Sequence, residues 1–174
     1  MQFRTLERSE IEQIWTIDRR EVIEKVYYLE DGDLRLRRAY FNVQGWQPDD
    51  VEKTTPLLYE CFDRGGTFNG AFEGDQLVGV AVLDTIWRGP RNDLLQLEFL
   101  HVSRDYRARG LGGRLFEQAR ATARERGARG LYISATPSEN TIRFYRSRGS
   151  VVIGTPDPEL LAQEPEDIHL ECPV

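Results

Sequence analysis

The stretch Leu100-His101-Val102-Ser103-Arg104-Asp105-Tyr106-Arg107-Ala108-Arg109-Gly110-Leu111-Gly112-Gly113-Arg114 decides the fold of this chain. The apolar segment before it predicts a strand over residues 94–102. Beyond the glycines, apolar residues at positions 111, 115, 116, 119 and 123 have the spacing of a helix over residues 110–126. A strand therefore runs into a glycine-rich turn, and the turn runs directly into a helix.

This turn is suited to binding an anion. Glycines allow a sharp turn and leave no side chain between the backbone amides and a ligand. The helix N-terminus adds unpaired N–H groups and the positive end of the helix dipole. Arg107, Arg109 and Arg114 can contact phosphate oxygens. We therefore predict a pyrophosphate site. A tight turn without a ligand would explain the glycines, but not the three arginines around them.

Two common glycine-rich phosphate sites do not fit the stretch. The Gly-x-x-x-x-Gly-Lys-Ser/Thr loop of nucleoside triphosphatases is absent. The Gly-x-Gly-x-x-Gly pattern of dinucleotide-binding proteins, which follows an early strand and precedes an acidic residue, is absent as well.

The rest of the chain reads as further strands and helices. Helix starts are expected at Ser9-Glu10-Ile11-Glu12, at Asp49 or Asp50, and at Thr136-Pro137-Ser138-Glu139. Asp31-Gly32 and Gly74-Asp75 predict hairpin turns. Strands are expected over residues 2–6, 22–40, 67–73, 77–87, 131–135, 151–153 and 168–171. This order predicts a single α/β domain over residues 1–174, with a mixed sheet and helices on both of its faces.

Composition favours a cytoplasmic protein. No apolar run approaches the roughly 20 residues of a membrane span, and no secretory signal is visible. No membrane partner is therefore expected. Cys61 and Cys172 match no metal-ligand spacing, so no metal site is expected either. Residues 101–150 contain eleven arginines and four acidic residues, although the net charge of the chain is −6. This suits a phosphorylated ligand better than nucleic acid, because aromatic residues are not interleaved with the arginines.

Two segments carry a resemblance to a known family. Val102 and, after four intervening residues, Arg107-Ala108-Arg109-Gly110-Leu111-Gly112 resemble the Arg/Gln-x-x-Gly-x-Gly/Ala signature of the GNAT superfamily of N-acetyltransferases. The stretch from Asn140 through Phe144-Tyr145 to Gly149 resembles a later segment of the same family. The resemblance is specific over residues 94–153 and looser in the first half of the chain.

The resemblance implies a GNAT-like fold that binds acetyl-CoA as cosubstrate. In the family, two parallel strands splay apart and the pantetheine arm lies between them. Here these would be the strand that ends at Val102 and the strand 131–135. The residues that would bind the cofactor are Leu100, His101, Val102, Arg107, Ala108, Arg109, Gly110, Leu111, Gly112, Gly113, Arg114, Asn140 and Tyr145.

Catalytic roles follow from the chemistry of amine attack on a thioester. Tyr145 matches the family position that often protonates the leaving thiolate, and the alternative is a tyrosine that merely packs in the core. An amine is protonated at neutral pH, so a base is needed, and Glu98 is the first candidate. A structural ion pair would explain Glu98 equally well. His101 faces the other side of the strand and is expected to be structural, and His169 has no assigned role.

The first half of the chain is expected to bind the acceptor. Tyr27, Tyr28, Trp46 and Trp87 could form an aromatic wall that prefers a cation, or could serve as core residues. We favour a small-molecule primary amine as the acceptor. We expect it to attack directly in a ternary complex, because neither cysteine lies in the motif region, where an acyl-cysteine route would need one. The alternatives are acetylation of a protein lysine or N-terminus, and a non-catalytic acyl-CoA-binding module. The hairpin around Asp31-Gly32 is expected either to cover the active site or to form a homodimer contact.

Overall fold

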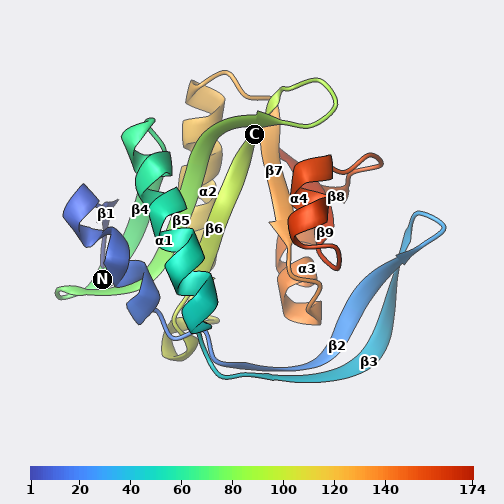
Figure 1. Cartoon of the computed structure of the whole chain (residues 1–174), viewed down its shortest axis with the longest axis horizontal. Coiled ribbons are helices and arrows are strands. Elements are labelled where there is room, and N and C mark those ends of the chain that lie inside the picture. Colours follow the sequence, from blue (N-terminus) through green and yellow to red (C-terminus); the bar gives the residue numbers. More distant parts are fainter. The chain divides into compact units, whose positions relative to one another are not determined.

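The computed structural model describes all residues, Met1–Val174. Its helices and strands follow the chain from blue to red in Figure 1. They form two compact units. The first unit comprises Met1–Glu21, Val43–Thr85 and Leu97–Thr122, and the second comprises Val22–Asn42, Ile86–Gln96 and Ala123–Val174. The boundaries fall within four strands and one helix, which contribute residues to both units.

The first unit contains four strands in the order β1-β4-β5-β6. They are β1 (Gln2–Thr5), β4 (Thr67–Glu73), β5 (Gln76–Arg88) and β6 (Leu94–Val102). β4 is antiparallel to both β1 and β5. The helices of this unit are the 3-10 helices η1 (Arg8–Thr16) and η2 (Arg104–Tyr106) and the α-helices α1 (Pro48–Asp63) and α2 (Leu111–Glu125).

Helices pack on both faces of β5 in the first unit. Val80 and Val82 are fully buried in a core with Leu58 of α1 and Ile14 of η1. Gly79, whose Cβ position would point the other way, lies against Leu115 of α2. Successive β5 residues point alternately toward the two helical layers. Because both faces of the strand are covered, both need apolar side chains, and the sequence of β5 is therefore apolar almost throughout.

The second unit contains the chain's parallel strand pair. The first residues of β6 pair in parallel with β7 (Gly130–Ala135), and the order continues as β6-β7-β9-β8 with antiparallel pairs. β9 is Ile168–Pro173 and β8 is Val151–Val152. The helices are α3 (Glu139–Arg146) and α4 (Pro158–Gln163). Parallel and antiparallel pairs with flanking helices confirm the predicted mixed α/β class.

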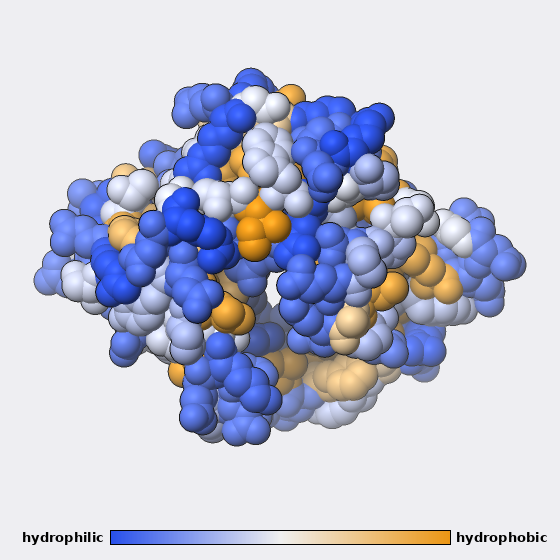
Figure 2. All heavy atoms as spheres, turned by 45° about the horizontal axis from the view of Figure 1, so that its top comes forward, coloured by the Kyte–Doolittle hydropathy of each residue, from blue (hydrophilic) through white to orange (hydrophobic).

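A separate two-stranded sheet also belongs to the second unit. β2 (Glu21–Glu30) and β3 (Asp33–Val43) are joined by the predicted Asp31-Gly32 turn. Both turn residues have positive φ, 51° and 84°, as a type I′ turn requires. Several large apolar side chains of this hairpin are exposed, namely Val22, Leu29, Leu36, Tyr40 and Phe41. Figure 2 shows hydrophobic groups emerging among mostly hydrophilic ones on one face of the molecule.

All three expected helix starts differ from the structure. Helix α1 begins at Pro48 with Gln47 as its cap, although Asp49 or Asp50 was the expected cap. The first helix begins one residue before the predicted cap, because Glu7 and Glu10, not Ser9 and Glu12, form the capping box. Helix α3 starts at Glu139 with Ser138 as its cap, although Thr136 was the expected cap. The Pro137 carbonyl accepts a hydrogen bond from the Tyr27 N–H at 2.8 Å, and Ser138 bridges to Val26. This strand-like pairing holds the backbone extended until Ser138.

Helix α4 was not predicted from the sequence. Its cap is Asp157, whose side chain accepts hydrogen bonds from the N–H groups of Glu159 and Leu160. Leu160 packs with Leu94 and Tyr132 in a small core of the second unit. A six-residue helix gives too short a pattern for periodicity to reveal, although Asp157-Pro158 is a good helix start. No helix of the structure is both long and apolar enough to cross a membrane.

Candidate active site

The glycine-rich turn adopts the geometry that its sequence predicts. Ala108 and Gly110 have positive φ, 59° and 84°, so the backbone reverses sharply after β6. The Arg114 N–H donates to the Gly110 carbonyl at 3.1 Å and begins the hydrogen-bond ladder of α2. The N–H groups of Leu111, Gly112 and Gly113 precede that ladder. They form the unpaired amide terminus that a phosphate can use.

The three arginines of the turn have different environments. Arg107 Nε donates to the Val102 carbonyl at 3.0 Å, and its Nη1 lies 3.7 Å from a Glu21 carboxylate oxygen. Arg107 thus braces the turn against the end of β6. Arg109 stacks on Tyr106 and Arg114 on Phe3, with 5.3 Å and 3.8 Å from the guanidinium carbon to the ring centre. Neither of these two is ion-paired, so their charge is available to an anion.

The end of β6 is held by contacts within the first unit. The Val102 side chain lies near Gly79, on the side of β5 that α2 covers. The Ser103 N–H donates to the Val78 carbonyl at 2.8 Å, and Ser103 Oγ accepts from the Asp18 N–H at 3.0 Å. Leu100, His101 and Val102 are all half-buried. The strand end next to the turn is therefore fixed before any ligand binds.

His101 belongs to an aromatic cluster. Its ring centre lies 4.9 Å from that of Trp46 and 5.3 Å from that of Phe99. Trp15 packs edge-on against Trp46, and the Arg19 guanidinium covers Trp46 at 4.6 Å. Burial, together with Arg19 and Arg107, lowers the pKa of His101 to about 3. His101 is neutral at physiological pH and is a weak base, which agrees with a structural role.

Glu98 lies on β6 near a buried polar group of the first unit. Asp84 is 2% exposed and pairs with Arg64 at 2.6 Å. Burial and the neighbouring Asp84 and Glu98 carboxylates raise the pKa of the Cys61 thiol, whereas Arg64 lowers it. Cys61 is thus a buried, protonated thiol and an unsuitable nucleophile. Glu98 itself is half-buried.

Tyr145 and Asn140 both lie on α3 in the second unit. Ser138 caps this helix by accepting a hydrogen bond from the Thr141 N–H at 3.2 Å. Asn140 is exposed in the first turn, whereas Tyr145 is only 7% exposed. Burial raises the pKa of Tyr145, an effect that Asp167 increases and Arg148 opposes. The phenol is therefore neutral at physiological pH and holds a proton that it can donate.

The predicted aromatic wall is distributed over the two units. Trp46 lies in the first unit, in the aromatic cluster with His101. Tyr27, Tyr28 and Trp87 lie in the second. Tyr28 is covered by the Arg37 guanidinium at 5.2 Å, and Trp87 is 42% exposed. Sequence reasoning missed Phe99 and Arg19, which complete the cluster around Trp46. The apolar and basic character of these two residues gave no sign of it.

His169 belongs to a buried hydrogen-bond network of the second unit. The hydroxyl of Tyr132 accepts a hydrogen bond from the Asp157 N–H at 2.7 Å and shares a second hydrogen bond with His169 Nδ1, also at 2.7 Å. Burial lowers the pKa of His169. Arg88, which is 7% exposed, bonds to Gln96 and to Asp157 in the same region. His169 is thus a neutral structural residue.

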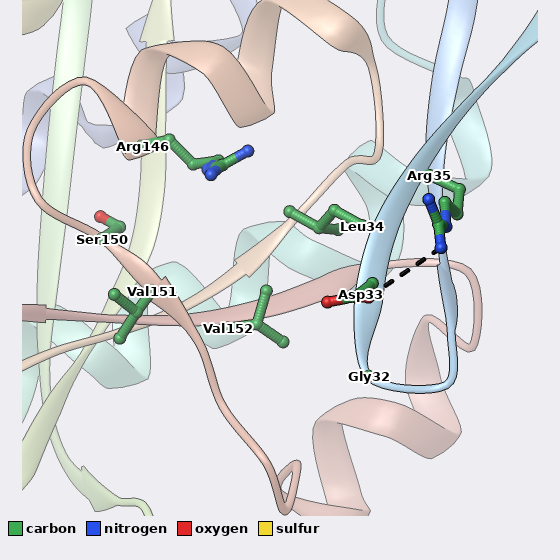
Figure 3. Close-up of a pocket in the computed structure, with 8 residues that line it drawn as sticks. All are labelled: Gly32, Asp33, Leu34, Arg35, Arg146, Ser150, Val151 and Val152. Atoms are coloured by element: carbon green, nitrogen blue, oxygen red, sulfur yellow. Dashed lines mark ion pairs between the residues drawn. The ribbon is translucent and has the colours of Figure 1, made fainter.

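A cavity of about 370 Å³ lies within the second unit. It separates the β2–β3 turn from the end of α3 and from β8 (Figure 3). Leu34 and Val152 point into this space, and Arg35 turns toward Asp33 at 4.0 Å (Figure 3). Its lining residues are Gly32, Asp33, Leu34, Arg35, Arg146, Ser150, Val151 and Val152. None of the residues predicted for the active site lines it. The structure contains no group of three or more potential metal ligands.

Comparison with known proteins identifies a family. The model of the acetyltransferase (GNAT) family matches residues 24–149. This confirms the resemblance seen in the glycine-rich turn and in the Asn140–Gly149 segment. No curated protein sequence matches the chain.

Solved structures share the fold at low sequence identity. A nourseothricin acetyltransferase superposes with a TM-score of 0.72 at 21% identity, over 99% of this chain and 97% of that one. A protein of Bacillus anthracis assigned as a streptothricin acetyltransferase, solved with acetyl coenzyme A, gives 0.67 at 20% identity over 99% of each chain. The ribosomal-protein-S18-alanine N-acetyltransferase of Escherichia coli gives 0.60 at 15%, over 99% and 93%.

Proposed function

Because this chain belongs to the acetyltransferase (GNAT) family and is an N-acetyltransferase, we propose that it transfers the acetyl group of acetyl-CoA to a primary amine of a small molecule. One observation carries the proposal. The unpaired amides of Leu111, Gly112 and Gly113 lie beside two arginines that have no carboxylate partner, Arg109 and Arg114. This combination suits the pyrophosphate of a CoA thioester.

The remaining cofactor contacts follow the family pattern. Backbone groups of Leu100, His101 and Val102 would bond the pantetheine arm, and Ala108 shapes the turn through its positive φ. Asn140 would bond the same arm. Arg107 would act mainly by holding the turn, since it already bonds the Val102 carbonyl.

The transfer proceeds by direct attack in a ternary complex. The amine nitrogen attacks the thioester carbonyl carbon, and the bond between that carbon and sulfur breaks. Tyr145, neutral and buried, protonates the departing thiolate. The proton lost by the ammonium passes to Glu98, directly or through water. The buried, protonated Cys61 supports a route without an acyl-cysteine intermediate.

A small-molecule acceptor is supported by the names of two solved structures that share the fold. The nourseothricin and streptothricin acetyltransferases superpose better than the S18-alanine N-acetyltransferase does. The last of these supports the alternative, acetylation of a protein N-terminus. The net charge of −6 also suits a cationic acceptor.

We propose further that both units serve one acetyltransferase domain, since the family match takes residues from each. The predicted cytoplasmic location, the absence of a nucleic-acid partner and a homodimeric state are retained as proposals.

The first experiment measures the melting temperature with and without acetyl-CoA, using desulfo-CoA and ATP as comparisons. A ligand at about 100 times its Kd adds roughly 2.7 kcal/mol of stability. Both CoA forms should raise the melting temperature, and ATP should not. An equal shift with ATP would show that the turn binds anions in general and is not specific for CoA.

Acetyl transfer is then measured by release of free thiol with a panel of amines, including nourseothricin, and with alanine-terminated peptides. Faster transfer to small amines supports the proposal. Transfer to peptides alone would favour the protein N-terminal alternative. Binding of CoA without transfer to any amine would indicate a non-catalytic module.

A further inference from the structure

Asp167 places a half-buried carboxyl group in the second unit without a cationic side chain beside it. The residue lies directly before β9, in the segment that follows α4. Its Oδ2 accepts a hydrogen bond from Ser134 Oγ of β7 at 2.9 Å. The other partly or fully buried aspartates of the chain are treated differently. Asp84 pairs with Arg64 and Asp157 with Arg88, whereas Asp18 pairs with Arg20 and Asp93 with Arg91 and Arg129.

The groups around Asp167 add no positive charge. Ser134 contributes a neutral hydroxyl from β7, and Glu164 contributes a second negative charge from the end of α4. Tyr145 of α3 lies near enough for the Asp167 carboxylate to raise the pKa of its phenol. Burial and Glu164 together raise the pKa of Asp167 to about 6, against the opposing effect of the Ser134 hydrogen bond. A half-buried anion without a cationic neighbour is costly, and a cationic ligand would lower that cost.

We propose that Asp167, oriented by Ser134, is the subsite that binds the ammonium group of the acceptor next to Tyr145. The inference rests on the proposed function, in which Tyr145 protonates the leaving thiolate. A primary ammonium carries one positive charge and three N–H donors. Ser134 occupies one carboxylate oxygen of Asp167 and leaves lone pairs of the other for such donors. An amine held there would lie close to the phenol that acts on the thioester.

The subsite has a characteristic pH dependence. Only the ionised form of Asp167 attracts an ammonium, and its pKa is about 6 in the protein alone. The ammonium keeps its charge in this range, because its ordinary pKa is about 10.4. The KM for the amine should therefore rise as the pH falls below about 6. Binding of the cation should lower the pKa of Asp167 and release a proton.

The kinetic test compares Asp167→Asn with Glu166→Gln. Asparagine keeps an oxygen for Ser134 but loses the charge. Glu166 is exposed one residue away, so its variant removes the same charge from the same segment. We expect Asp167→Asn to raise the KM for the amine about 10- to 100-fold while the Kd for acetyl-CoA changes less than about twofold. Glu166→Gln should leave both unchanged. An unchanged KM in Asp167→Asn overturns the inference and leaves the acetyltransferase proposal intact.

A second measurement does not depend on turnover. The pKa of Asp167 is followed by NMR in protein labelled at the aspartate carboxyl carbon, with and without the amine of highest kcat/KM. If no amine of the panel is acetylated, 1,3-diaminopropane serves as the probe. A fall in the pKa of Asp167 supports the subsite. An unchanged value overturns it, even if the wild-type enzyme transfers acetyl groups.

Discussion

At the scale of single residues, the site depends on which charges are paired. Arg107 is committed to the Val102 carbonyl and Glu21, whereas Arg109 and Arg114 rest only on aromatic rings. The sequence predicts the same phosphate contact for all three arginines, but the structure separates a bracing residue from two that are available to a ligand. The carboxylates divide in the same way, since Asp84 is paired and Asp167 is not.

Removal of an available arginine should weaken cofactor binding. We expect Arg109→Ala and Arg114→Ala each to raise the Kd for acetyl-CoA about tenfold, because a charge-assisted contact to phosphate is lost. The effect should shrink at high salt. Calorimetric titration measures it, with the exposed Arg124→Ala at the other end of α2 as the control. Equal losses in Arg124→Ala would show that only the general positive field matters.

Removal of the Tyr145 hydroxyl should slow the chemical step. Tyr145→Phe keeps the buried ring and loses the proton donor, so kcat should fall about 100-fold or more while the Kd for acetyl-CoA stays unchanged. Steady-state kinetics and calorimetry separate the two. Tyr40→Phe, on an exposed tyrosine, is the matched control. A kcat within threefold of wild type would show that Tyr145 only packs in the core and does not act in catalysis.

The negative charge on Asp167 should lower the free energy of unfolding as the pH rises. Its pKa is raised to about 6 from an unfolded value near 3.8, so the folded state retains a proton that the unfolded state loses between these values. Stability from this group therefore falls as the pH rises through that window. Asp167→Asn should be more stable than wild type at pH 8 by about 1–3 kcal/mol, and the gain should vanish near pH 3. Urea denaturation at both pH values tests the sign.

At the scale of elements, the turn between β6 and α2 depends on backbone geometry. Gly110 has a φ of 84° with open space around its Cβ position. Gly110→Ala should therefore destabilise the protein by about 1–2 kcal/mol through backbone strain alone. Gly154 has equally open space without a positive φ, so Gly154→Ala should be nearly neutral. Denaturation of the two variants checks this, and equal effects would contradict the strain argument.

At the scale of the whole molecule, the β2–β3 hairpin leaves large apolar side chains exposed to solvent. Tyr40 is 70% exposed and Phe41 55%. Exposed apolar groups of this kind favour contact with another molecule, and they are consistent with the predicted homodimer. Sedimentation velocity should give about twice the chain mass of 20.1 kDa. A monomer at all concentrations would contradict the homodimer and leave the hairpin as a cover for the site.

The sequence by itself determined the class of fold, the order of most elements and the family. These rest on local signals, such as the Asp31-Gly32 turn, the helical spacing of α2 and the glycines around Gly110, which act between residues close along the chain. Tyr145 and Asn140 could be named because they lie in a motif.

Only the tertiary structure decided which side chains those residues contact and how deeply they are buried. Three features depend on residues far apart in the chain: the aromatic packing of His101 with Trp46, the start of α3 after its pairing with Tyr27 and Val26, and the isolation of Asp167. The largest separation is the 112 positions between Val26 and Ser138. Burial and charge at such sites depend on side chains that the fold brings together. The local sequence therefore carries no signal for the protonation of His101 or for the missing cation at Asp167.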